Sequence, residues 1–168
     1  GTLIHVHPSV GDVYAHHARP FGYSGSAQAL NNGFRMQWKK MGGIESLGHQ
    51  SGAEAERNFW RTLVYEVFQP MGGLDRFDEY FDLIFEVFRE KANWQIYEDV
   101  TESKILETLK KKGIALGVIS NWDSRLLSTL ENIGLAQYFD FILSSAVIGS
   151  AKPDQKIFRE ALRLSGVA

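Results

Sequence analysis

The sequence contains no cysteine among its 168 residues. This absence excludes disulfide bonds, thiolate zinc sites, iron–sulfur clusters and a cysteine nucleophile. The absence of cysteine fits a reducing compartment but is also compatible with secretion, so it does not prove where the protein is located. We expect a cytoplasmic protein.

The sequence also lacks an excess of charge of either sign, with 18 Lys and Arg against 20 Asp and Glu and a formal net charge of −2. Without a basic surface to meet a phosphate backbone, we expect no nucleic acid partner. Long apolar runs are missing too. The run at residues 114–119 is far shorter than the roughly 18 residues of a membrane helix, so we expect no membrane partner. Nothing in the composition predicts an oligomeric state.

Hydrophobic residues make up 44% of the chain, which is ordinary for a globular protein. In the first half they recur every three to four positions, the spacing of amphipathic helices. Four such helices with short connections rich in Gly and Pro predict a compact helical bundle. The expected helices span residues 9–19, from a cap at Ser24 or Ser26 to Gly42, residues 51–69, and from a cap at Asp75 to Phe88.

The second half alternates helical and strand-like segments, a pattern typical of a parallel α/β layer. The continuous apolar run at residues 114–119 predicts a strand buried on both faces. Residues 139–143 predict a second strand. Helices are expected at residues 101–112, from a cap at Asp123 or Ser124 to Ile133, and from Pro153 or Asp154 onward.

Two loops follow the predicted strands, where ligands bind in open α/β sheets. The first is Ser120-Asn121-Trp122-Asp123, whose hydroxyl and amide can donate hydrogen bonds to an anion. It also fits a simple turn in which Asp123 caps the next helix. The second contains Lys152-Pro153-Asp154, where the ammonium can face a phosphate or carboxylate. It also fits a solvated loop lysine. Their joint position at one edge of the sheet favours an anion site.

These segments resemble motifs of the haloacid dehalogenase superfamily of hydrolases. Ser120-Asn121 resembles its second motif, Lys152-Pro153-Asp154 its third, and Gly1-Thr2-Leu3 the end of its first motif, Asp-x-Asp-Gly-Thr-Leu. The run from Val118 to Leu126 is most similar to the branch typified by the rhythmically expressed gene 2 protein. The resemblance implies a partial Rossmann-like parallel sheet core, residues 1–8 and 93–168, with an inserted all-helical cap bundle, residues 9–92.

The resemblance also implies roles. Ser120, with Asn121 beside it, would bind the phosphoryl oxygens, and Lys152 would stabilise the charge of nucleophile and substrate. The expected activity is that of a Mg²⁺-dependent phosphatase of a small phosphorylated metabolite, acting through an aspartyl-phosphate. The family's two motif-one aspartates would stand before Gly1, and the motif-four acids after Ala168. We therefore expect a fragment that is inactive alone and lacks the side-chain Mg²⁺ ligands.

Two alternatives stay open: a 2-haloacid dehalogenase, and a non-catalytic binding or assembly module of the same fold. Histidines near the N-terminus are expected at the surface or near substrate rather than on a metal ion; they are His5, His7, His16 and His17. Aromatic residues at helical spacing are expected in the bundle core, with one or two lining a pocket; they are Trp38, Phe59, Trp60, Phe77, Phe81, Phe85 and Phe88.

Overall fold

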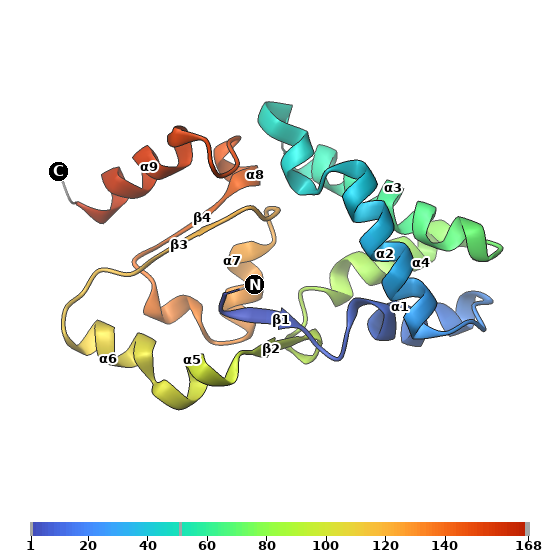
Figure 1. The fold of residues 1–168 in the computed structure, drawn as a ribbon, viewed down its shortest axis with the longest axis horizontal. Helices are drawn as coiled ribbons and strands as arrows, with labels where there is room; N and C mark the ends of the chain where they lie inside the picture. The colour runs from blue at the N-terminus through green and yellow to red at the C-terminus, as the bar shows by residue number, and fades with distance from the viewer. Residues whose placement is uncertain (1, 51, 167–168) are drawn as a thin grey trace.

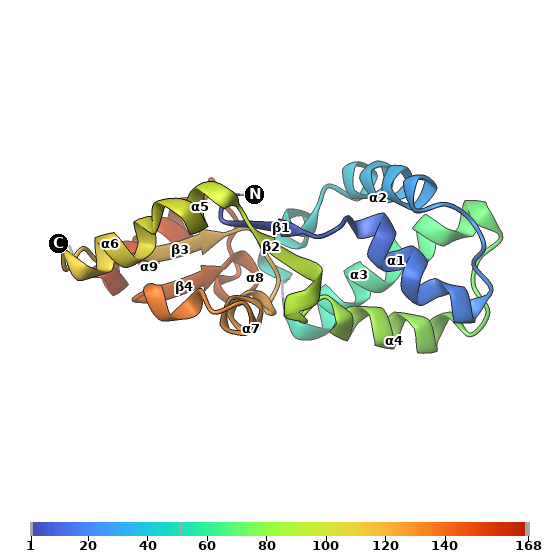
Figure 2. The same ribbon diagram turned by 90° about the horizontal axis from the view of Figure 1, so that it is seen from below.

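The computed structural model describes residues 2–50 and 52–166, so Gly1 of the first motif lies outside the described residues. Figures 1 and 2 show two lobes lying end to end. The helical lobe consists of α1 (Val10–Ala18), α2 (Ala27–Met41), α3 (Ala53–Phe68) and α4 (Phe77–Val87). The α/β lobe consists of α5 (Glu98–Ser103), α6 (Ile105–Lys111), β3 (Gly117–Ser120), α7 (Leu126–Asn132), β4 (Phe141–Ser144), α8 (Ser145–Ile148) and α9 (Gln155–Ser165). In the described part of the chain, no helix combines the length and apolarity needed to cross a bilayer.

A short antiparallel ribbon lies between the two lobes. It pairs β1 (Ile4–Val6) with β2 (Trp94–Ile96), so that His5 faces Gln95. The two strands flank the helical lobe in sequence, and the chain enters and leaves that lobe through this ribbon (Figure 2). Neither strand was predicted, because three residues carry too little pattern to read.

Serine side chains cap the first two helices. The cap at Ser26 was one of the two predicted candidates, whereas the cap at Ser9 was not predicted. Ser9 accepts a hydrogen bond from the backbone N–H of Asp12, and Ser26 accepts one from that of Ala29. The cap predicted for the fourth helix, Asp75, was wrong. Its cap is Arg76, in the left-handed conformation with φ 49°, and the backbone N–H of Asp75 instead donates to the carbonyl of Phe21 at 3.0 Å. Asp75 therefore joins two connections of the bundle rather than capping α4.

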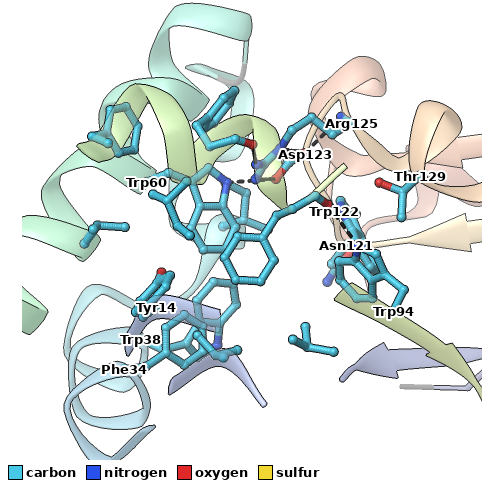
Figure 3. A pocket seen from close by; sticks show the side chains of 18 residues that line it. Tyr14, Phe34, Trp38, Trp60, Trp94, Asn121, Trp122, Asp123, Arg125 and Thr129 are labelled. Carbon is cyan, nitrogen blue, oxygen red and sulfur yellow. Dashed lines mark hydrogen bonds and ion pairs between the residues drawn. The ribbon is translucent and has the colours of Figure 1, made fainter. Parts of the chain in front are cut away.

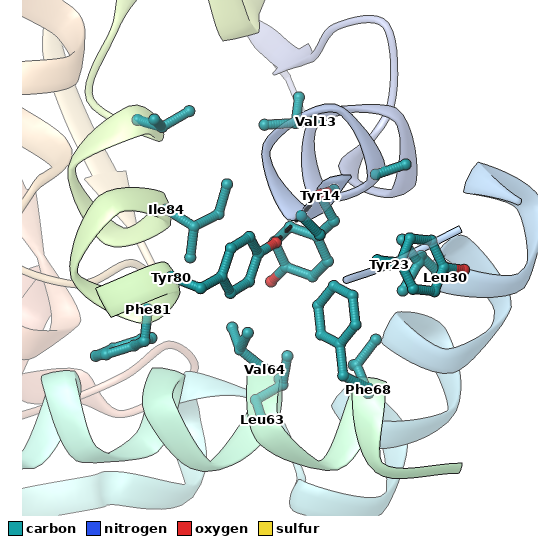
Figure 4. Close-up of a cluster of buried hydrophobic side chains, with 14 of the residues drawn as sticks. Val13, Tyr14, Tyr23, Leu30, Leu63, Val64, Phe68, Tyr80, Phe81 and Ile84 are labelled. Carbon is teal, nitrogen blue, oxygen red and sulfur yellow. Dashed lines mark hydrogen bonds between the residues drawn. The ribbon is translucent and has the colours of Figure 1, made fainter. Parts of the chain in front are cut away.

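The core of the helical lobe is strongly aromatic. Tyr14, Phe68 and Tyr80 lie at its centre, each at most 2% exposed, with ring centroids 5.3–6.0 Å apart (Figure 4). Edge-to-face and tilted ring contacts of this kind add to the stabilisation from burial. The Tyr80 hydroxyl donates to the carbonyl of Tyr14, so the buried polar atom has a partner. These contacts hold α1, α3 and α4 together.

Gly11 brings α1 against α2. A Cβ placed there would lie 2.1 Å from the carbonyl oxygen of Ala27. We expect Gly11→Ala to lower the free energy of unfolding by about 1–3 kcal/mol, because the backbone of α2 must shift. Gly33→Ala is the matched control, since Gly33 also lies inside a helix and its Cβ position has no atom closer than 3.4 Å. Urea unfolding of the full-length protein measures both, and equal stabilities would contradict this close approach.

The parallel sheet is formed by β3 and β4, with Gly117 opposite Phe141 and Ser120 opposite Ser144. The prediction of a strand buried on both faces over residues 114–119 was wrong. The strand begins only at Gly117, and Ile114 is 46% exposed. In the described part of the chain β3 pairs with β4 alone, so its outer edge and part of its face stay accessible.

The helix predicted over residues 101–112 is two helices. Lys104 adopts φ 50°, the left-handed conformation, and separates α5 from α6. Buried side chains of the α/β lobe form two clusters of their own, one around Leu126 and Leu130 and one around Leu143 and Ile157. The parallel sheet with flanking helices confirms the predicted fold class. The domain bounds at residues 8 and 93 stay a prediction.

Candidate active site

The loops after β3 and β4 meet at the carboxyl end of the parallel sheet. Ser120 and Ser144 are partners in the ladder, so both strands end at one level. Ser145 then ties the loops together, since its hydroxyl accepts from the backbone N–H of Trp122 at 3.1 Å and donates to the Trp122 carbonyl at 3.2 Å. Ser145 was not predicted to belong to the site, because it lies in a short helix with no distinctive sequence pattern.

Asn121 and Lys152 are joined directly. The Asn121 side-chain oxygen accepts from the backbone N–H of Lys152 at 2.7 Å, and its amide nitrogen donates to the Lys152 carbonyl at 3.1 Å. The Lys152 ammonium donates to the carbonyl of Ile119 at 2.9 Å. The peptide bond from Lys152 to Pro153 is cis. The structure therefore brings together the two loops that the sequence singled out.

Ser120 is half-buried and is the last residue of β3, directly before Asn121. A hydroxyl, a carboxamide and an ammonium thus share one rim of the sheet. Such a set can bind an anion, because the ammonium supplies charge and a serine hydroxyl can supply a directed hydrogen bond. The Asn121 amide nitrogen donates to the Glu45 carboxylate at 3.2 Å as well as to the Lys152 carbonyl, so this side chain positions Lys152. The specific roles of Ser120, Asn121 and Lys152 stay predictions.

A buried network of hydrogen bonds links the loop after β3 to the helical lobe. The Asp123 carboxylate, 1% exposed, accepts from the Arg125 guanidinium at 2.7 and 3.0 Å and from the Trp60 indole N–H at 2.8 Å. Arg125 also donates to the carbonyl of Phe85 at 2.8 Å. The carboxylate of Glu56, on α3, accepts from the backbone N–H and the hydroxyl of Ser124.

This network corrects the cap prediction at the start of α7. The cap residue is Arg125, which makes no side-chain cap bond. The Asp123 carboxylate does accept from the backbone N–H of Arg125 at 2.9 Å, as a capping side chain would, but Asp123 lies two residues before the cap position. Asp123 instead pairs with Arg125 and reaches Trp60 on α3, while Ser124 binds Glu56. Partners more than sixty residues apart leave no spacing pattern in a sequence, so the network was not predicted.

A cavity of about 320 Å³ opens beside Asn121, between the two lobes (Figure 3). Its wall includes Trp122, Asp123 and Arg125 from the loop after β3, and Tyr14 from α1. Five of the seven aromatic residues predicted for the bundle core line it; they are Trp38, Trp60, Phe81, Phe85 and Phe88. The expectation of one or two was too low, because α2, α3 and α4 all turn aromatic faces toward this space.

The histidines lie near the start of the chain. The His16 and His17 rings pack edge to face with centroids 4.8 Å apart, and those of His5 and His7 lie 6.4 Å apart. Burial lowers the pKa of His17, with a further contribution from the neighbouring His16. Within residues 2–50 and 52–166, no three His, Asp or Glu side chains gather where they could hold a metal ion.

The chain matches the family model of haloacid dehalogenase-like hydrolases over residues 1–168. It is 33% identical to haloacid dehalogenase-like hydrolase domain-containing protein 3 of Bos taurus, over 99% of this chain and 66% of that protein. It is 28% identical to the rhythmically expressed gene 2 protein of Drosophila melanogaster, over 99% and 66%. A phosphoserine phosphatase of Thermus thermophilus is 31% identical over 75% of this chain and 47% of its own length.

Among solved structures, an L-2-haloacid dehalogenase from Xanthobacter autotrophicus superimposes with a TM-score of 0.69 at 19% identity, over 100% of this chain and 62% of that one. At this identity the likeness concerns the fold alone. The chain spans about two thirds of the length of the curated relatives named above from Bos taurus and Drosophila melanogaster. The resemblance read from Ser120-Asn121 and Lys152-Pro153 is confirmed, and the chain belongs to the haloacid dehalogenase-like hydrolases, in the branch of the rhythmically expressed gene 2 protein.

Proposed function

We propose that this chain forms the phosphate-binding part of a phosphatase that acts on a small phosphorylated metabolite. The observation that carries the proposal is the clamp between Asn121 and Lys152, which holds an ammonium and a carboxamide beside Ser120 at the end of β3. Phosphoryl transfer requires little covalent chemistry from a protein beyond its nucleophile, and depends mainly on positioning and on stabilising the charge of the oxygens.

In the proposed reaction, the Ser120 hydroxyl donates a hydrogen bond to the phosphoryl oxygens and Lys152 neutralises charge that develops on them. Asn121, whose amide nitrogen already donates to the Lys152 carbonyl and to the Glu45 carboxylate, holds Lys152 beside them. The nucleophile would be the first aspartate of the family's Asp-x-Asp motif, which precedes the residues resembling Gly1-Thr2-Leu3. Its carboxylate would attack phosphorus as the ester P–O bond breaks, and the second aspartate, as the acid, would protonate the alcohol that leaves. The second aspartate, now a base, would then take a proton from the water that hydrolyses the aspartyl-phosphate to release phosphate.

Magnesium dependence stays a prediction from the family. In the described part of the chain, no group of His, Asp and Glu side chains fits the ion. The Lys152 ammonium at the rim would also repel a cation. The roles proposed for Ser120, Asn121 and Lys152 therefore use only their own groups.

A 2-haloacid dehalogenase is the second candidate. The cavity beside Asn121 favours it, because the wall is mostly apolar and a haloacid offers a small apolar body next to one carboxylate. The same rim would then bind the carboxylate instead of a phosphoryl group.

The test uses the full-length protein with Mg²⁺ present. Phosphate release from a panel of phosphomonoesters is compared with halide release from 2-chloropropionate. We expect phosphate release at rates well above the metal-only blank and no halide. Halide release alone would establish the dehalogenase. Neither product, from protein that unfolds cooperatively, would favour the non-catalytic module.

A further inference from the structure

The cavity between the lobes has an unusual wall. Fourteen of its eighteen residues are apolar or aromatic, and only four have an amide, a charged group or an aliphatic hydroxyl: Asn121, Asp123, Arg125 and Thr129. Nine of the eighteen are aromatic; they are Tyr14, Phe34, Trp38, Trp60, Phe81, Phe85, Phe88, Trp94 and Trp122. All four tryptophans of the sequence lie in this wall.

The charged groups of the wall are already paired. Asp123 and Arg125 neutralise each other at 2.7 Å, and Arg125 lies 4.0 Å from the centroid of the Phe85 ring. The Trp94 indole donates to the carbonyl of Phe88. Burial raises the pKa of the Tyr14 phenol far above its ordinary value, so that group stays neutral. A ligand body in this space would find no counter-charge for an ammonium or carboxylate of its own.

One polar group in the wall has no partner. The Thr129 hydroxyl oxygen is buried and makes no hydrogen bond, and the residue is 1% exposed. Figure 3 shows Thr129 across the cavity from Trp60, beyond Trp122. An unsatisfied buried hydroxyl destabilises a protein, so its position here points to a ligand. One neutral polar atom on the ligand body would be accommodated there.

The volume of the cavity limits the size of the organic group that it can bind. A cavity of about 150 Å³ is sufficient for benzene. This one has about 320 Å³, which is room for roughly two such rings. Aromatic walls favour flat ligands, because offset and edge-to-face contacts need two ring surfaces.

We propose that the cavity binds the organic body of the substrate, and that this body is a flat, uncharged aromatic group of about two rings. The preferred substrates are then aryl phosphomonoesters, in preference to phosphorylated amino acids or sugars. This rests on the proposed phosphatase function, since Asn121 lies both in the cavity wall and at the phosphate rim. The ester bond would lie where the two meet.

The test compares kcat/KM of the full-length protein for three aryl phosphates. We expect 1-naphthyl phosphate to exceed phenyl phosphate by about tenfold or more, since one methylene in an apolar pocket already changes kcat/KM by that order. 4-Carboxyphenyl phosphate, whose phenol resembles naphthol in acidity but carries a charge, should fall below phenyl phosphate. Phosphate release with equal or reversed preferences would overturn the inference and leave the phosphatase intact.

Two matched variants test whether the preference for the naphthyl substrate arises in the cavity. Val10→Phe narrows the cavity and should bring the ratio of naphthyl to phenyl turnover toward one. Leu127→Phe makes the same kind of change at an exposed position outside the cavity, and should preserve the ratio. Equal losses in both variants would contradict this location.

A binding measurement keeps the inference testable without turnover. Calorimetric titration of the full-length protein compares 1-naphthylmethylphosphonate with benzylphosphonate, neither of which can be hydrolysed at the carbon–phosphorus bond. Tighter binding of the naphthyl compound by about tenfold or more supports the aromatic cavity even if every phosphomonoester fails as a substrate. Equal affinities would overturn it.

Discussion

Replacing Lys152 by alanine should lower kcat for phosphate release by about 10²–10³-fold, the typical loss when one preorganised stabilising group is removed. The ammonium is held by the Ile119 carbonyl at 2.9 Å, and the Lys152 backbone is fixed on both sides by the Asn121 amide. Alanine keeps the two bonds between the Lys152 backbone and Asn121, and removes the ammonium with its bond to the Ile119 carbonyl. The measurement is steady-state phosphate release by the full-length protein.

Lys156→Ala is the matched control for charge. Lys156 is also exposed and lies in the first turn of α9, where its backbone N–H binds the side chain of Asp154. It should keep the activity of the parent protein. Both variants should unfold at the same temperature as the parent, because an exposed lysine contributes little to stability. Unchanged kcat in Lys152→Ala would contradict the proposed role.

The position of the site residues at one edge of the sheet could be predicted from the sequence, because it depends only on short segments of the chain. A strand, a loop with Ser120 and Asn121, and a second strand followed by Lys152 are sufficient, since parallel strands place their carboxyl ends together. The helix starts at Ser26 and Asp154 were predictable for the same reason, because each side chain binds a backbone N–H two or three residues onward. Interactions between residues close in the chain can therefore be recognised from the local sequence.

The features that the sequence did not predict depend on distant partners or on unusual backbone. Lys104 separates two helices because it adopts a left-handed conformation, which is uncommon for lysine. The break occurs at a residue that is neither Gly nor Pro, so the sequence gives no signal for it. The ribbon of β1 and β2 pairs segments some ninety residues apart, as His5 with Gln95 shows. Asp123 was predicted as a helix cap, and its carboxylate does bind the backbone N–H of Arg125, but the sequence does not show its hydrogen bond to Trp60 of the other lobe.

The network around Asp123 should be the most sensitive point of the whole structure to substitution. Arg125→Met keeps the length and apolar stem of the side chain but leaves the Asp123 carboxylate buried without its cation. We expect the free energy of unfolding to fall by about 3–5 kcal/mol, the usual consequence of removing one partner of a buried ion pair. Urea unfolding of the full-length protein gives the value.

The exposed pair of Arg163 and Glu160 on α9 provides the control, because Arg163→Met makes the same chemical change at an ion pair of similar length. Its side chains are 67% and 31% exposed, against 8% and 1% for Arg125 and Asp123. Water screens the exposed pair, so its loss should lower the free energy of unfolding far less than the loss of Arg125 does. The double variant Asp123→Leu/Arg125→Met separates charge from packing. Recovery of much of the lost stability would show that the unpaired carboxylate is the cause, whereas a further loss would assign the effect to the hydrogen bonds to Trp60 and Phe85.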